Sequence, residues 1–169
     1  QSSMEIMELV AHELSMFIDR QQSEEKANKL SRAVEQSSVS VVITNREGTI
    51  EYVNPFFTEL TGYSFEEARS KNPNILQSGH HSKAFYENLW NTILSGKDWE
   101  GELMNKKKTG ELYWEKAVIT PIVNRKGVIT NILGIKEDIT ERKKMLKELV
   151  ESKEKAQESD KLKTAFWVT

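Results

Sequence analysis

The stretch Gly134-Ile135-Lys136-Glu137-Asp138-Ile139-Thr140-Glu141-Arg142 decides how this chain is organised. Upstream of it, alternating β-branched residues predict a strand, and downstream an uninterrupted charged segment predicts a long helix. We call residues 134–142 the joint, because a strand that continues directly into a helix must move that helix whenever the sheet moves. The sequence therefore indicates a signalling architecture more clearly than it indicates what is sensed.

The strands that lead to the joint form a simple pattern. Three long strands are predicted at 98–106, 111–123 and 128–138. Short turns at Lys108-Thr109-Gly110 and Asn124-Arg125-Lys126-Gly127 join them as hairpins, so the three strands form an antiparallel meander. Two shorter strands are predicted earlier in the chain, at 39–45 and 50–54, with a turn at Gly48 between them.

Short helices are predicted between the second and third strands. Pro55 suits the first turn of one helix, which Gly62 ends. Ser64-Phe65-Glu66-Glu67 has the spacing of a capping box and starts another. Ser82 caps a third helix over 83–94, while 72–79 reads as irregular and polar. The predicted fold class is α+β: a five-stranded antiparallel sheet with short helices on one face.

Long helices are predicted at both ends. The first spans about 3–37, with a narrow apolar stripe that includes Leu14, Phe17 and Leu30, and the last runs from Glu141 to about Phe166. Narrow stripes of this kind favour pairing with another helix, so both helices are expected to form a parallel homodimer. The predicted organisation is an N-terminal helix at 1–36, a globular domain at 37–140 and a C-terminal signalling helix at 141–169.

Composition excludes several classes of function. The 169 residues carry a net charge of -2, which gives no field for nucleic acid or for an anionic membrane. The chain has no cysteine, which excludes disulfides, thiolate metal sites and thiol nucleophiles and fits a reducing, cytoplasmic location. No apolar run approaches the roughly 18 residues of a membrane span. We expect this chain to be a piece of a longer protein.

The order of predicted elements and several short motifs together resemble a PAS domain. The motifs are Asn45-Arg46-Glu47-Gly48, Tyr52-Val53-Asn54-Pro55, Leu60-Thr61-Gly62-Tyr63, Trp99-Glu100-Gly101-Glu102 and Asp138-Ile139-Thr140. The resemblance covers roughly residues 37 to 142. It implies a sensory or relay domain inside a larger signalling protein.

The two ends resemble parts of other signalling domains. Leu9 to Arg20 resembles the closing helix of a GAF domain, and Ser159 to Phe166 resembles the entry to the dimerisation helix of a sensor histidine kinase. The resemblance implies a downstream kinase domain and a response regulator as partners. The phospho-accepting histidine of that family is absent here, so this fragment is expected to have no enzymatic activity, whereas its parent is expected to be a histidine protein kinase.

The segment 71–105 is similar to the flavin-binding PAS domain of the nitrogen-fixation redox regulator. The resemblance implies FAD as a candidate cofactor, with Trp90 and Asn105 as contacts and Asn72 and Trp99 beside them. A flat apolar wall and amide groups suit an isoalloxazine ring. Light-oxygen-voltage domains form a flavin adduct with a cysteine near the position of Pro73, which this chain lacks. A ligand-free dimerisation spacer remains the alternative.

Two further groups of residues are candidates for a function. Asp138, Ile139 and Thr140 are the predicted signal relay: Asp138 accepts hydrogen bonds at the strand end, and Thr140 caps the helix. His80 and His81 are expected in a solvated loop, with no metal site, because no carboxylate lies near them at ligand spacing. No nucleophile–base pair or phosphate loop is visible, so no catalytic residue is predicted.

Overall fold

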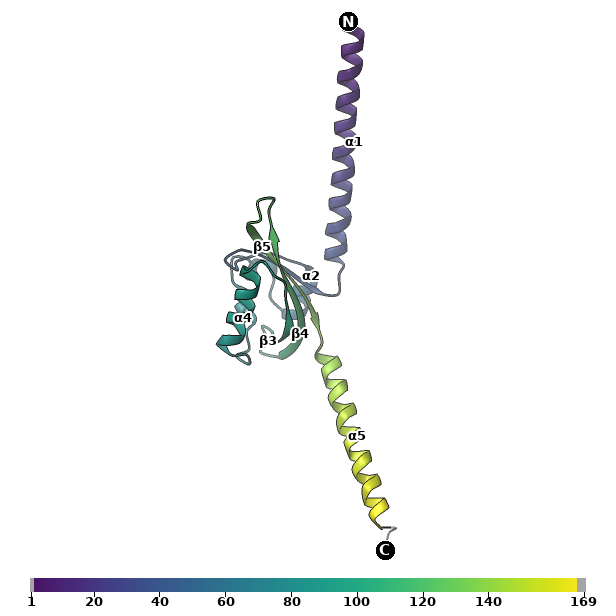
Figure 1. Ribbon diagram of the computed structural model, residues 1–169, viewed down its shortest axis with the longest axis vertical. Coiled ribbons are helices and arrows are strands. Elements are labelled where there is room, and N and C mark those ends of the chain that lie inside the picture. The colour runs from purple at the N-terminus through teal and green to yellow at the C-terminus, as the bar shows by residue number, and fades with distance from the viewer. Residues whose placement is uncertain (1, 167–169) are drawn as a thin grey trace. The chain divides into compact units, whose positions relative to one another are not determined.

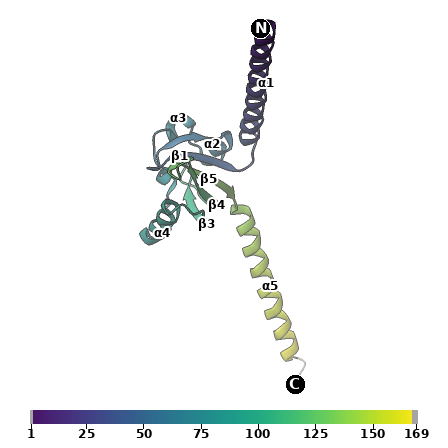
Figure 2. The same cartoon turned by 45° about the horizontal axis from the view of Figure 1, so that its top comes forward.

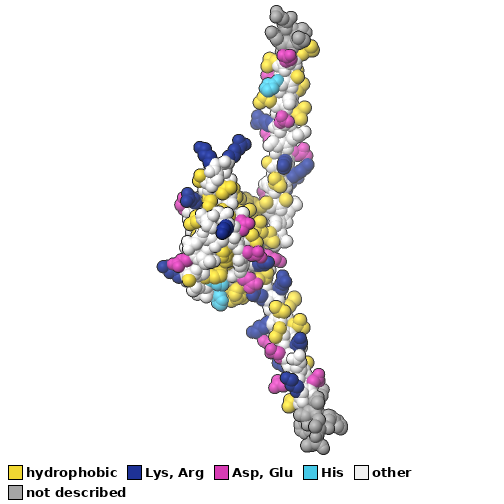
Figure 3. Space-filling view, in the orientation of Figure 1, with side chains coloured by type: hydrophobic (Ala, Val, Ile, Leu, Met, Phe, Trp, Pro, Cys, Tyr) yellow, Lys and Arg dark blue, Asp and Glu magenta, His cyan; other side chains and the backbone are white. Residues whose placement is uncertain are grey.

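The computed structural model describes the backbone of residues 2–166 and the side chains of residues 7–162. The chain divides into two compact units, residues 1–37 and 38–169. The first unit is helix α1 (Ser2–Glu35), as the sequence predicts. Its large apolar side chains are exposed, with Phe17 at 60% and Leu30 at 61% of their full surface (Figure 3). The single chain therefore leaves this stripe uncovered.

The second unit is built on a five-stranded antiparallel sheet (Figure 1). Its strands are β1 (Ser40–Asn45), β2 (Ile50–Val53), β3 (Trp99–Lys106), β4 (Leu112–Val123) and β5 (Ile129–Asp138). They are ordered β2-β1-β5-β4-β3, so the first and last strands of the domain lie side by side at its centre. The predicted five-stranded sheet and its meander are confirmed.

Short helices fill the connection from β2 to β3 (Figure 2). They are α2 (Pro55–Thr61), α3 (Phe65–Ala68), the 3-10 helix η1 (Pro73–Leu76) and α4 (Lys83–Leu94). The Ser64–Glu67 capping box forms as predicted, and Gly62 ends α2 with a left-handed φ of 78°. The segment that reads as irregular in the sequence thus contains one helical turn, which Asn72 caps with its side chain.

The core lies between the sheet and these helices in two neighbouring clusters. One gathers β1, β2, α2 and η1 around Phe57 and Leu76. The other gathers α4 and strands β3, β4 and β5 around Ile93, Trp99 and Leu103. Burial of these large side chains supplies the main driving force for folding. Helix α4 is thereby fixed against β3 and β4, which positions its Tyr86 and Trp90 side chains.

Helix α5 (Thr140–Phe166) begins directly after the last residues of β5. The continuous strand-to-helix transition that the joint predicts is therefore present, with a helix start one residue earlier than expected. Residues 167–169 of the predicted signalling helix lie outside the described residues. Among the described residues, no helix is long and apolar enough to cross a membrane.

Candidate functional site

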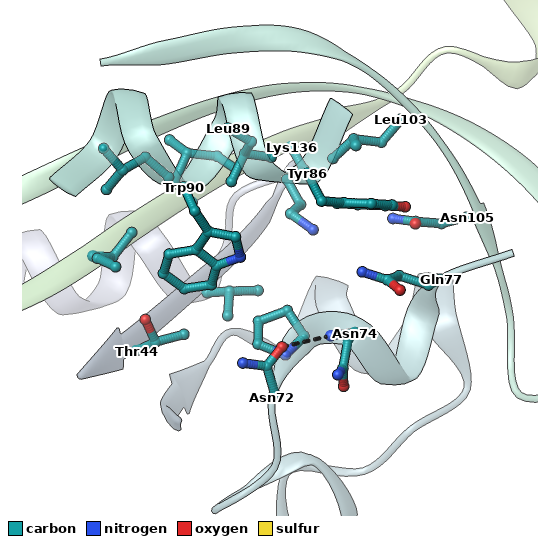
Figure 4. A pocket seen from close by; sticks show the side chains of 16 residues that line it. Thr44, Asn72, Asn74, Gln77, Tyr86, Leu89, Trp90, Leu103, Asn105 and Lys136 are labelled. Carbon is teal, nitrogen blue, oxygen red and sulfur yellow. Dashed lines mark hydrogen bonds between the residues drawn. The ribbon is translucent and has the colours of Figure 1, made fainter. Parts of the chain in front are cut away.

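A pocket of about 100 Å³ lies between the sheet and the helical connection (Figure 4). Strands β1, β3, β4 and β5 supply one wall, α4 supplies another, and η1 with its flanking residues closes the third. Its lining is mainly apolar, with a few polar groups that converge from different elements. The labelled polar side chains are Thr44, Asn72, Asn74, Gln77, Tyr86, Asn105 and Lys136. This combination is typical of sites for small ligands.

Trp90 forms an aromatic wall of the pocket and lies against the turn between β1 and β2. Gly48 has a φ of +85°, and a Cβ at this position would lie 2.7 Å from both the Trp90 ring and the Asn72 amide nitrogen. Only glycine therefore allows the turn, the indole and Asn72 to come this close. Asn72 also lines the pocket, but its Oδ1 accepts the Asn74 amide at 3.0 Å and so is engaged in capping η1.

Asn105 lies in the pocket wall beside a buried ion pair. Its side chain is oriented inward together with that of Leu103, since both residues are 4% exposed. The Asn105 amide donates to Glu115 Oε1 at 2.7 Å, and the Lys136 ammonium lies 2.7 Å from the same oxygen. Buried charges are stable only when they are paired and hydrogen-bonded in this way. The sequence analysis missed both charged residues.

Strand alternation could have indicated the pair. Glu115 lies between the inward residues Tyr113 and Ala117, and Lys136 follows the inward residues Ile132 and Gly134 at spacings of two. The apolar residues of β5 point in both directions, however, and lysine and glutamate are rarely buried. Composition alone therefore favours an exposed position for both charges.

Tyr86 of α4 brings a hydroxyl group to the pocket wall. The oxygen is buried and has no hydrogen-bond partner among the described residues. Burial, reinforced by the negative charge of Glu115, raises the pKa of Tyr86, so the hydroxyl keeps its proton. A protonated, unpartnered hydroxyl is a hydrogen-bond donor that a ligand can satisfy.

Trp99, expected beside a cofactor, does not line the pocket. It is 7% exposed and packs in the core against Phe85, with ring centroids 5.6 Å apart. Its indole covers Gly101, where a Cβ would lie 2.5 Å from the ring. The Trp99-Glu100-Gly101 motif thus serves packing, because the glycine provides the space in which the indole lies flat on its own strand.

The loop after η1 is tied to strand β3 through His81. Its Nε2 accepts the Met104 amide at 2.9 Å, and its ring stacks on Phe85 with centroids 4.1 Å apart. Burial, with a smaller effect of His80, lowers the pKa of His81. His80 is exposed, as expected, whereas the expectation of a solvated His81 is wrong because the ring has a backbone donor and an aromatic partner. Among residues 7–162, no group of His, Cys, Asp and Glu could hold a metal ion.

The joint is fastened to the neighbouring strand β4 at Trp114. The backbone amide of Ile139 donates to the Trp114 carbonyl at 2.9 Å, and the Thr140 hydroxyl accepts the Trp114 amide at 2.9 Å. Asp138 Oδ1 accepts the Thr140 amide at 2.9 Å, a backbone bond of the kind predicted for it. The Thr140 hydroxyl therefore bonds β4 instead of capping its own helix, because the end of β4 presents a free amide beside it. Ile139 is buried, at 5% exposure.

Lys143 adds a second attachment in the first turn of α5. Its ammonium lies 4.4 Å from the centre of the Trp114 ring and 2.5 Å from Glu102 of β3. At exposed sites a cation over an indole face stabilises by roughly 0.5–1 kcal/mol and an ion pair by roughly 0.2–1 kcal/mol, so both contacts favour this geometry modestly. Trp114 is thus a contact of α5 and does not line the pocket.

The chain is similar to known proteins of the PAS domain family and to signalling proteins that contain related sequences. The profile of a family described as PAS domain matches residues 38–141. The nitrogen fixation regulatory protein of Klebsiella pneumoniae is 33% identical over 135 residues, which cover 75% of this chain and 27% of that protein. A blue-light-activated histidine kinase of Brucella abortus (strain 2308) is 30% identical over 111 residues, covering 64% of this chain and 23% of the kinase.

Solved structures share the same architecture. An RNA-binding light-oxygen-voltage receptor superposes with a TM-score of 0.66 at 25% identity, over 74% of this chain and 37% of that one. The chain spans about a quarter of the length of the two sequence relatives it matches. The similarity therefore concerns only part of each of those proteins.

Proposed function

Because the chain belongs to the PAS domain family, we propose that it is the sensory and relay module of a two-component sensor histidine kinase. In this proposal residues 37–140 form the sensory domain, 1–36 pair with a second copy, and 141–169 lead into the kinase dimerisation domain. A response regulator is the partner of the parent protein. The blue-light-activated histidine kinase among the relatives supports this assignment.

One observation carries the proposal: β5 passes into α5 while the backbone of Trp114 holds both Ile139 and Thr140. A displacement of β4 relative to β5 therefore acts directly on the first turn of α5. Exposed apolar side chains on α5, such as Met145 and Leu149, form a thin stripe for pairing. A weakly paired coiled coil has alternative packings that differ by only a few kcal/mol, so a small displacement can select between them.

The test is the double change Asp138→Ala with Thr140→Ala in the parent protein. We expect the sensory domain to remain folded and autophosphorylation to become independent of the stimulus, because the first turn of α5 loses the side-chain bonds of Asp138 and Thr140. Phosphoryl incorporation with and without stimulus measures the coupling, and circular dichroism of the 169-residue chain measures folding. Wild-type regulation in the double variant would reject the relay and leave both residues as structural.

A second candidate function, a FAD-binding redox sensor, is favoured by the pocket and by the similarity to the nitrogen fixation regulatory protein. Bound FAD would supply a two-electron redox centre. Trp90 would provide a flat wall, while Asn105, Gln77 and the unpartnered Tyr86 hydroxyl would bind the polar edge of the ring. The chemistry of these groups fits a flavin.

The volume of the pocket restricts flavin binding more than the chemistry of its lining does. A cavity of about 150 Å³ is known to accept a single benzene ring, and this pocket measures about 100 Å³. A three-ring isoalloxazine is larger than this space, so it would have to extend through the open side of the pocket or displace a wall. Trp90, which is only half-buried and closes the pocket beside Gly48, is the side chain best placed to move.

A visible absorption spectrum of the natively purified chain tests this function. A flavin spectrum that weakens in Trp90→Ala and persists in Trp90→Phe would support an aromatic wall for the ring. Asn105→Ala should weaken binding further or shift the flavin potential, since an unpaired polar group costs about 1–3 kcal/mol. Unchanged flavin content and potential in Trp90→Ala and Asn105→Ala would refute the assignment. A spectrum without flavin would favour the ligand-free spacer or a colourless ligand.

A further inference from the structure

The buried pair of Lys136 and Glu115 connects the pocket to the joint, because Lys136 belongs to the joint and also lines the pocket. Its nitrogen and oxygen are 2.7 Å apart, and the two side chains are 8% and 1% exposed. Lys136 lines the pocket, as does Asn105, which donates to the same Glu115 oxygen at 2.7 Å. The two side chains that contact Glu115 Oε1 therefore both line the pocket, where a ligand can touch them.

A ligand in the pocket would compete with Glu115 for these donors. Figure 4 shows the Lys136 ammonium and the Gln77 amide directed into the pocket from different walls. An ammonium has three N–H donors, one of which is directed at Glu115, and ligand acceptors that bond the others would weaken its hold on the carboxylate. Because a buried carboxylate is costly once its partners are removed, even a partial loss of Lys136 must shift Glu115 or its strand.

Glu115 is placed where such a shift reaches the joint. It follows Trp114, whose backbone amide and carbonyl hold Thr140 and Ile139. It is also the register partner of Asp138 across the β4–β5 ladder. Lys136 lies two residues before Asp138 on the same strand. The pair thus connects the two strands at the point where α5 starts.

We propose that the Lys136–Glu115 pair couples the pocket to α5, with Lys136 as the residue that senses a ligand bearing hydrogen-bond acceptor atoms and Glu115 as its internal competitor. This inference deepens the proposed relay function and rests on it. It assigns the pocket a ligand with an acceptor edge, such as ring nitrogens or carbonyl oxygens. A cationic ligand is disfavoured, because Lys136 would repel it.

Hydrogen–deuterium exchange on the 169-residue chain tests the coupling without a kinase assay. The variants are Lys136→Met, Glu115→Gln and the double change, which replaces both charges by neutral groups of similar size. Lys116→Met is the matched control, since Lys116 is a half-exposed lysine of β4 that pairs with Glu100 at 2.8 Å. The readout is exchange of the backbone amides of 139–143 relative to those of 41–53.

Each single variant should raise the exchange rate of the backbone amides of 139–143 by about tenfold or more. The exchange rate of the amides of 41–53 should change by less than about threefold. In the double variant the exchange rate of the amides of 139–143 should return toward the wild-type value. In Lys116→Met this exchange rate should equal that of the wild type. If Lys136→Met does not fold, Glu115→Gln compared with the double variant decides the question. Equal increases in both segments, or no increase at 139–143, would overturn the coupling.

The exchange experiment and the phosphoryl-incorporation experiment can have different outcomes, so each proposal can fail without the other. Exchange at 139–143 can respond to the ion pair even if phosphoryl transfer in the parent protein does not depend on Asp138 and Thr140. Conversely, a functional relay with no response to the pair would leave the proposed function standing and remove Lys136 from it.

Discussion

The replacement Thr140→Val tests the attachment of α5 to the sheet at a single atom. Valine keeps the shape of threonine and has a similar helix propensity, but it lacks the hydroxyl that accepts the Trp114 amide at 2.9 Å. A buried amide left without an acceptor costs about 1–3 kcal/mol. Trp114 is only half-buried, which allows partial access to water, so we expect a loss of about 1–2 kcal/mol. The second contact, from the hydroxyl to the Trp114 carbonyl at 3.4 Å, is too long to add much.

Urea unfolding of the 169-residue chain, followed by tryptophan fluorescence, measures the free energy of unfolding. The matched control is Thr130→Val on β5, whose exposed hydroxyl makes one long bond of 3.3 Å to the Ile122 carbonyl. We expect the control to change stability by less than about 0.5 kcal/mol. Equal free energies of unfolding for the two variants would show that the Trp114 amide does not depend on Thr140, and would remove the physical basis of the relay.

Two further predictions concern dimerisation and pH. Leu30→Glu with Val34→Glu should convert a dimer into monomers in sedimentation experiments at micromolar concentration, since Leu30 is 61% exposed in the single chain; a persistent dimer would reject α1 as the interface. Stability should fall as the pH drops below the unfolded histidine pKa of about 6.5. The pKa of His81 is lowered in the folded state, and its Nε2 must lose the Met104 amide on protonation. His81→Asn should reduce this acid loss of unfolding free energy and His80→Asn should not; identical pH profiles in both variants would contradict the assignment.

Much of the fold follows from local signals in the sequence. The five strands and helices α2 and α4 lie within about two residues of their predicted bounds, because hairpin turns, caps and alternation are all local features. Asn105 shares a buried face with Leu103 because strand alternation places residues two apart on the same side. The single helical turn η1 was not predicted, because four residues are too few to show a helical period.

The details of the site depend on partners that are distant in sequence. Thr140 was expected to cap its own helix, yet Trp114, 26 residues earlier, supplies its partner. The ion pair of Glu115 with Lys136 requires the β4–β5 register, which composition does not reveal. Whether an indole such as Trp99 lines a cavity or fills a core is decided by packing across the whole domain.

The attachment at Trp114 has a mechanical consequence. Helix α5 has 27 residues and is therefore about 40 Å long at 1.5 Å per residue. The bonds of Ile139, Thr140 and Lys143 to the sheet all lie at its first turn. A shift of about 0.5 Å across that turn, which is about 5.4 Å long, tilts the helix axis by about 5°. The far end then moves by about 3.5 Å, close to the rise of one residue along a strand. Helix α5 therefore amplifies motion about its attachment to Trp114. A displacement of β4 that is smaller than a bond length moves the far end of the helix far enough to change which residues it contacts.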